Sequence, residues 1–215
     1  MAAPGRPVSR LHALPRRAGV LVAALVLTLV LAPPASSAAG APTLINFDAE
    51  GLNGALLTSQ YEAQGLKMGF AKDFGQPAPS EGKFDCGPPR VEAQNGGLEA
   101  ASAPNWATLQ ACPGGGTPLK GTYGALAKGP TSTLSVKVSN VTPAGGPGVE
   151  MDLVGYNSAG QEVASGHGEA ISGKWQVISL LVSGEPQISF FAVHAAKAKR
   201  QNRPLIAVAI SDCYQ

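Results

Sequence analysis

Acid–base chemistry would have to come from few side chains in this sequence. Beyond residue 40 the only histidines are His167 and His194. His167 lies in Gly166-His-Gly168-Glu169, a turn-like segment without the second histidine of the H-E-x-x-H zinc motif. The chain also lacks a G-x-S-x-G elbow, a Walker loop, a dinucleotide-binding fingerprint and a Cys-x-x-Cys pair. We therefore expect a protein that is not an enzyme.

Paired carboxylates are the one catalytic device that sequence motifs do not reveal, because the two acids need not be neighbours in the chain. Glu150 and Asp152 are two residues apart in a predicted strand, so they share a face. We interpret them as part of a solvated sheet surface.

Aromatic and basic side chains are the candidates for binding. Trp106 lies in a long irregular segment, where a ring could be displayed to a ligand, and Tyr61 is a second candidate. Burial is the alternative for each ring, and it is the more common fate of large aromatic residues. A further set, Lys197, Lys199 and Arg200, lies in the basic run 195–203. This run is either an anion-binding patch or, as we prefer, a solvated hairpin tip.

The first 38 residues have the three parts of a secretory signal peptide. Four arginines and no acid precede an apolar stretch from Gly19 to Ala32, and small residues follow two prolines. The apolar stretch is shorter than the roughly 20 residues of a membrane span, which is the alternative. We expect residues 1–38 to be removed, 39–215 to form one domain, and the protein to be secreted with no membrane span.

Removal of the signal would change the charge balance. The whole chain has 16 Lys and Arg against 14 Asp and Glu, and every acid lies beyond residue 40. Without the four leading arginines, 12 basic residues face 14 acidic ones, a net charge of −2. Nucleic-acid binding usually needs a clearly basic domain, so we expect no nucleic-acid partner.

Three cysteines allow at most one disulfide bond within the chain. Export would permit such a bond, and we favour Cys86–Cys112, which would close the Gly- and Pro-rich segment between them. Cys213 would then be a buried thiol or a link to another molecule.

Short alternating runs predict an all-β domain that must position these residues. The chain has 27 glycines and 18 prolines, and no long stretch has apolar residues at helical spacing. Many short strands with turns between them are typical of a β-sandwich. The segment 75–116 reads as irregular, and the turn Asn157–Gly160 predicts a hairpin. The expected strands are 44–47, 65–70, 121–126, 131–141, 148–157, 161–165, 174–182, 187–194 and 205–211.

Five short motifs in order resemble a family of secreted bacterial β-sandwich proteins. The motifs are Ile45-Asn-Phe-Asp48 with Gln60-Tyr61, Gly65-Leu-Lys-Met68, Ala101–Leu109, Tyr156–Gly160 with Lys174-Trp-Gln-Val177, and Ala209-Ile-Ser-Asp212. The resemblance implies an antiparallel, galactose-binding-like jelly roll, the fold of many carbohydrate-binding modules. Many relatives end in a sorting tail with a Pro-Glu-Pro motif, which is not seen here, and this favours free secretion.

The resemblance also implies a structural calcium ion where the first and last strands meet. Asp48, Glu50 and Asp212 could supply the hard oxygen ligands that calcium prefers. The alternative is that these acids cap turns, as aspartate commonly does.

Taken with the resemblance, these residues favour a secreted, non-catalytic binding module for carbohydrate or another cell-surface polymer. A structural or adhesive extracellular protein is the first alternative, and an unrecognised glycan hydrolase is the second.

Overall fold

A computed structural model describes residues 43–48, 51–76, 86–93, 105–111, 120–140, 148–195 and 208–214, the last segment and residues 111 and 120 as backbone only. Contacts within the chain separate residues 1–40 from a compact unit that begins at Ala41 and ends at Gln215. All described residues belong to the second unit, and everything below concerns it.

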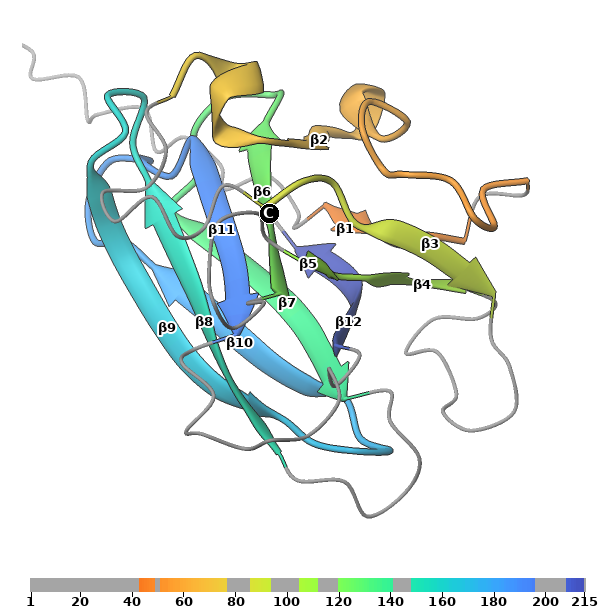
Figure 1. Ribbon diagram of the computed structural model, residues 1–215. Coiled ribbons are helices and arrows are strands. Elements are labelled where there is room, and N and C mark those ends of the chain that lie inside the picture. Colours follow the sequence, from red (N-terminus) through yellow and green to blue (C-terminus); the bar gives the residue numbers. More distant parts are fainter. Residues whose placement is uncertain are drawn as a thin grey trace, which may run out of the picture. The chain divides into compact units, whose positions relative to one another are not determined.

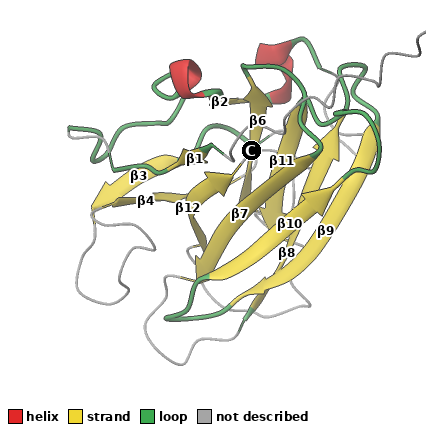
Figure 2. Cartoon of the chain, turned by 180° about the vertical axis from the view of Figure 1, so that it is seen from behind, coloured by secondary structure: helices red, strands yellow, loops and turns green. Residues whose placement is uncertain are grey.

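The unit consists of two antiparallel sheets, drawn from opposite sides in Figures 1 and 2. In sheet A the order is β10-β7-β12-β4-β3, and β1 also pairs with β12. Its strands are β1 (Leu44–Ile45), β3 (Arg90–Ala93), β4 (Asn105–Thr108), β7 (Thr133–Asn140), β10 (Gln176–Leu181) and β12 (Val208–Tyr214).

In sheet B the order is β2-β6-β11-β8-β9, and β5 also pairs with β6. Its strands are β2 (Leu66–Gly69), β5 (Gln110–Ala111), β6 (Lys120–Leu126), β8 (Val149–Tyr156), β9 (Glu162–Ala170) and β11 (Phe190–Ala195). The predicted antiparallel β-sandwich is therefore confirmed.

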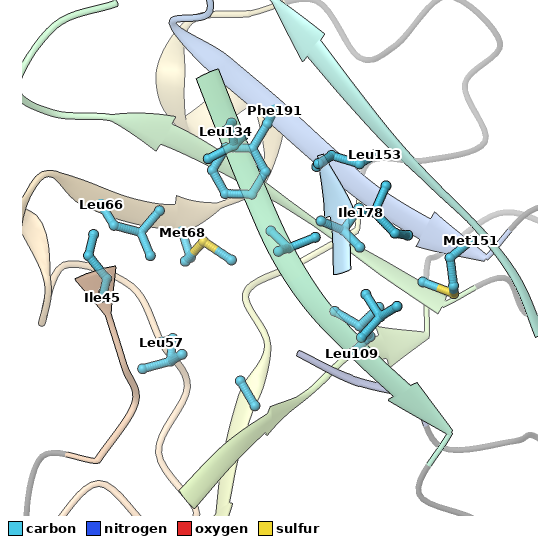
Figure 3. Packing of buried hydrophobic residues seen from close by; sticks show 14 of the residues in the cluster. Ile45, Leu57, Leu66, Met68, Leu109, Leu134, Met151, Leu153, Ile178 and Phe191 are labelled. Atoms are coloured by element: carbon cyan, nitrogen blue, oxygen red, sulfur yellow. The ribbon is translucent and has the colours of Figure 1, made fainter. Parts of the chain in front are cut away.

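Alternation of apolar and polar residues decides which face of each strand is buried. In β7, Leu134, Val136 and Val138 are fully buried, whereas Ser135 and Lys137 between them are partly exposed. One apolar cluster joins the inner faces of both sheets, and Leu134, Ile178, Leu153 and Phe191 are among its members in Figure 3. Burial of this shared surface holds the two layers together.

The segment 75–116 is the main correction to the predicted strands. Instead of one irregular stretch, its described parts contain β3, β4 and β5. Their pairing is long-range: β4 lies between β3 and β12, and β5 pairs with β6. A strand of four residues or fewer carries too little alternation to be distinguished from a loop by sequence alone.

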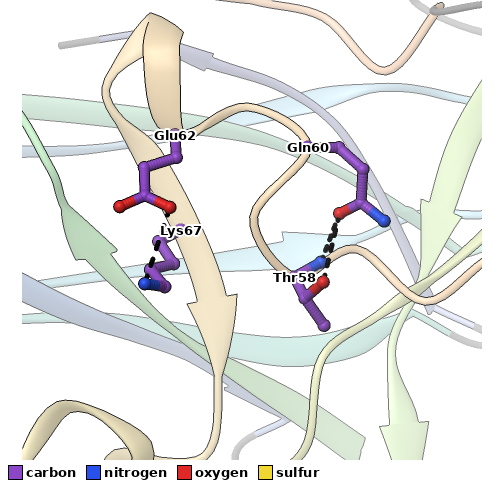
Figure 4. A network of polar contacts seen from close by, with 4 residues as sticks. All are labelled: Thr58, Gln60, Glu62 and Lys67. Carbon is purple, nitrogen blue, oxygen red and sulfur yellow. Dashed lines mark hydrogen bonds and ion pairs between the residues drawn. The ribbon is translucent and has the colours of Figure 1, made fainter.

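Two short 3-10 helices flank β2. The first, η1 (Glu62–Gln64), ends at Gly65, whose φ of 110° is left-handed and favours glycine. Lys67 of β2 forms an ion pair with Glu62 of η1 at 3.5 Å, and Gln60 Oε1 accepts a hydrogen bond from the backbone N–H of Thr58 at 2.6 Å (Figure 4). These contacts fix the turn that leads into sheet B.

The strand β9 corrects the expectation for the Gly166–Glu169 segment, which is part of a strand and not a turn. Gly166 and Gly168 face inward, opposite Leu153 and Met151 of β8. A Cβ atom on Gly166 would lie 2.7 Å from the backbone oxygen of Ser179 in β10. The two glycines therefore let the edge of sheet B approach β10 of sheet A closely.

The second 3-10 helix, η2 (Ala71–Phe74), follows β2 and lies against β6. Among the described residues no helix has the length and apolar character that crossing a membrane requires.

Candidate functional site

Aromatic, acidic and histidine side chains lie together on the outer face of sheet B. Successive strand residues point to opposite faces, so the neighbours of the inward-facing Phe191 and Leu153 point outward. The strand registers align these outward residues in rows that run across the sheet. Phe190 lies opposite Tyr156 in one row, and His194, Asp152 and His167 lie side by side in another.

Four aromatic rings form a cluster on this face, which we call the aromatic cluster: Phe74, Tyr123, Tyr156 and Phe190. Tyr123 is buried at its centre, 5.9 Å from Phe74, 6.0 Å from Tyr156 and 6.2 Å from Phe190, measured between ring centroids. The other three rings are half-buried. Offset rings at these distances stabilise one another beyond the burial of their area, so the cluster is closely packed.

The helix η2 positions Phe74 within the cluster. It begins after Phe70, whose backbone N–H donates a hydrogen bond to the Asp73 carboxylate at 3.0 Å. It ends at Gly75, which has a left-handed φ of 67°. A second anchor follows at Gln76, whose side-chain amide donates a 3.5 Å hydrogen bond to the Ser158 carbonyl in the β8–β9 turn. Phe74 is thus held between the sheet and this turn.

Tyr156 combines a ring with a hydroxyl group that stays protonated. Burial raises its pKa to about 12, and the nearby charge of Glu162 acts in the same direction. The hydroxyl is consequently a hydrogen-bond donor at every physiological pH.

Asp152 is the centre of the polar row. It lies opposite His194 of β11 on one side and His167 of β9 on the other. His167 donates a hydrogen bond from Nδ1 to Asp152 Oδ1 at 2.8 Å, and this bond raises the pKa of His167. Burial has the opposite effect on His194, whose pKa is lowered. One histidine therefore gains a proton readily and the other resists it.

This arrangement can hold polar ligand groups. Asp152 accepts hydrogen bonds, and Nδ1 of His167 is turned to that carboxylate, which leaves Nε2 for a ligand. In the part of the chain that the structure describes, no three His, Cys, Asp or Glu side chains gather to hold a metal ion.

The structure overturns the two predicted aromatic binding residues. Trp106 is only 3% exposed in β4, opposite Glu92 of β3, so its ring offers no face to a ligand. Tyr61 is 5% exposed and packs edge-on against Phe47 in the core, with ring centroids 5.6 Å apart. In both cases burial of the large apolar ring stabilises the fold more than exposure would.

The predicted basic patch, Lys197, Lys199 and Arg200, lies outside the described residues, and its role stays a prediction. The same holds for the calcium site, since Glu50 and the side chain of Asp212 are not described. The pairing of β1 with β12, with Ile45 opposite Cys213, does bring the chain segments that carry Asp48 and Asp212 together. The Asp48 carboxylate accepts a hydrogen bond from the backbone N–H of Asn105 at 3.2 Å, as a capping aspartate would.

Cys86 is fully buried and disulfide-bonded. Its sulfur lies beside Gly121, where a Cβ atom would be 2.8 Å away from it. Gly121 pairs with Gln110 of β5, two residues before Cys112. Cys112 itself is outside the described residues, so the Cys86–Cys112 pairing stays a prediction.

Sequence reasoning missed Phe74 and Phe190 and the contact between Asp152 and His167. It did place Glu150 and Asp152 on one face, which the structure confirms. Alternation within 187–194 could have identified Phe190 as an outward ring, because Phe191 next to it must then face the core.

Comparisons with known proteins show only distant likeness. No family model matches the chain, and no curated protein matches it. Among solved structures, the chain is similar to the CBM22-1 xylan-binding domain from Paenibacillus barcinonensis Xyn10C, with a TM-score of 0.39 and 12% identity over 75% of this chain and 94% of that domain. It is also similar to an arabinose-bound MgGH51 α-L-arabinofuranosidase (TM-score 0.41, 16% identity, 59% of this chain) and to the enzymatically active domain of bacteriophage CBA120 tailspike protein 4 (TM-score 0.38, 13% identity, 76% of this chain). The matched part is about a fifth of each of those two chains, 21% in both.

Proposed function

We propose that this protein is a secreted, non-catalytic binding module that holds carbohydrate on the outer face of sheet B. The observation that supports the proposal is the aromatic cluster, in which Phe74, Tyr156 and Phe190 are half-buried around the buried ring of Tyr123. The apolar face of a sugar ring packs on a flat aromatic ring, while its hydroxyl groups need hydrogen-bond partners. Asp152 and His167 supply such partners on the same face.

The close packing and partial exposure of the rings favour binding over a merely structural role. Rings that are already held by neighbours lose little freedom when a ligand packs on them, which lowers the entropic cost of association. A ring used only for the core would be covered on both faces, as Phe191 is.

A panel of neutral glycans tests the proposal. Isothermal titration of the purified protein against cello-, xylo- and manno-oligosaccharides should detect binding to at least one series. Tyr156→Ala and Phe190→Ala should each weaken that binding about tenfold or more, as expected for a central aromatic contact.

Two further variants separate stacking from other effects. Tyr156→Phe keeps the ring and should retain affinity within about threefold, a loss of less than 1 kcal/mol. Leu181→Ala changes an exposed residue of sheet A, 74% accessible, and should not affect binding. If the alanine variants have the same melting temperature as the parent protein and still bind every glycan as it does, the outer face of sheet B is not the carbohydrate-binding site.

A further inference from the structure

The aromatic cluster lies at the end of β8, and the polar row crosses the middle of the same strand. Tyr156 and Asp152 are outward residues of β8, separated by the outward Val154. A strand rises about 3.3 Å per residue, so the four steps from Tyr156 to Asp152 span about 13 Å. A single pyranose ring covers less than half of this distance.

The surface between the aromatic cluster and the polar row suits a sugar chain. Val154 is 9% exposed and gives a low apolar floor next to the exposed hydroxyl of Ser165, its partner in β9. Beyond it, the side chains of Asp152 and His167 are 33% and 60% accessible. An occupant that lies along β8 therefore meets aromatic rings first, then an apolar floor, and finally hydrogen-bonding groups.

Charge on this face opposes an acidic polymer. The outward residues of β8 and β9 include four carboxylates, on Glu150, Asp152, Glu162 and Glu169. His167 is the one group among the outward residues of these two strands that can become positive, and Lys67, on the outward side of β2, is paired with Glu62. A negatively charged polysaccharide would be repelled, whereas a neutral one would not.

We infer that the outer face of sheet B binds a neutral polysaccharide chain, with at least three consecutive sugars lying along β8 from Tyr156 to Asp152. The inference rests on the proposed function and adds the ligand class and its direction. One sugar packs on the aromatic cluster, the next lies over Val154 and Ser165, and the third donates hydroxyl hydrogen bonds to Asp152. His167 is a positioning residue, since its Nδ1–H fixes the Asp152 carboxylate.

Affinity as a function of chain length tests this arrangement. In titrations of the full protein with the best-binding neutral series, from one to six sugars, affinity should rise at least tenfold between the monomer and the trimer and change little beyond the tetramer. Tyr156→Ala should weaken binding at every length. Asp152→Asn should weaken the trimer and longer oligomers about fivefold or more, and leave the dimer within about twofold.

The control variants and outcomes keep the two proposals apart. His167→Gln should reproduce the Asp152→Asn pattern in a weaker form. Leu181→Ala should leave the affinity unchanged for oligomers of every length. If the monosaccharide binds as tightly as the hexamer, or if polygalacturonate binds more tightly than every neutral oligomer, the chain-binding inference is wrong while carbohydrate binding stands. If no oligosaccharide of any length binds, the proposed function itself is wrong.

Discussion

The close approach of β9 to β10 can be tested by replacing Gly166 with alanine. The added methyl group would lie 2.7 Å from the backbone oxygen of Ser179 and 3.2 Å from a methyl carbon of Ile178. A backbone oxygen cannot rotate away as a side chain can, so the two strands must move apart. Overpacking of this kind costs about 3 kcal/mol at the upper end of its usual range.

A second effect acts in the opposite direction. Alanine stiffens the unfolded chain and stabilises the folded state by about 0.7 kcal/mol where the backbone conformation allows it. The strain outweighs this gain, and the folded state loses about 2 kcal/mol in total. For a domain of this size that corresponds to a melting temperature lower by about 4–8 °C.

Gly168 provides an internal comparison. Its added Cβ atom would be 2.8 Å from Cγ1 of Ile178, a side-chain atom that can shift. Gly168→Ala should therefore lower the melting temperature less than Gly166→Ala does, and Ser165→Ala, at an exposed position of the same strand, should lower it least. Thermal unfolding followed by circular dichroism gives all three values. A Gly166→Ala variant that melts within about 1 °C of the parent protein would refute the reasoning, given the cost of about 2 kcal/mol.

Three further predictions concern stability. Burial lowers the pKa of His194 below its usual 6.5, so the unfolded chain binds the proton more readily, and the free energy of unfolding should fall as pH decreases from 6.5 through the folded-state pKa. His167 acts in the opposite sense because its pKa is raised, but it is exposed, so its contribution to stability is small. Urea unfolding across this pH range should show the loss of stability in acid, and the loss should be smaller in His194→Gln. Leu153→Ala removes a fully buried core side chain and should cost about 3 kcal/mol in the same assay; a loss below about 1 kcal/mol would contradict the assigned core. Leu181→Ala, at a position 74% exposed, should stay within about 0.5 kcal/mol of the parent protein, and a larger loss would show that this side chain is covered.

The strands of this protein were largely predictable because their alternation is strong. In β7 and β8 the apolar residues recur at every second position, and that period alone identifies the inner face. Short strands gave no such signal. Every residue of β4 is buried, so its sequence has no alternation of apolar and polar residues. Trp106 was therefore assigned to an irregular segment and interpreted as a displayed ring.

The contact between Asp152 and His167 depends on register, which sequence predicts poorly. A hairpin closed tightly around the turn Asn157–Gly160 would put Asp152 opposite Ser165. In the structure Tyr156 pairs with Glu162, one residue beyond the partner that a tight hairpin would give it. The register shifts by one more residue between Tyr156 and Gly155, so Asp152 meets His167 instead. A shift by two residues keeps each side chain on its face, so the faces could be predicted although the partners could not.

The place of β12 in sheet A has a consequence for how the protein reaches its fold. This strand comes last in the described chain, yet it lies between β7 and β4 and also pairs with β1. The strands β1, β4 and β7 precede β12 in the chain and lack their shared partner until β12 joins them. Sheet A can close only after β12 has been made, and until then the edges of β4 and β7 that β12 will cover stay open to other chains. Closure of sheet A therefore comes late in the folding of this domain, and a delay at that stage leaves open strand edges that favour aggregation.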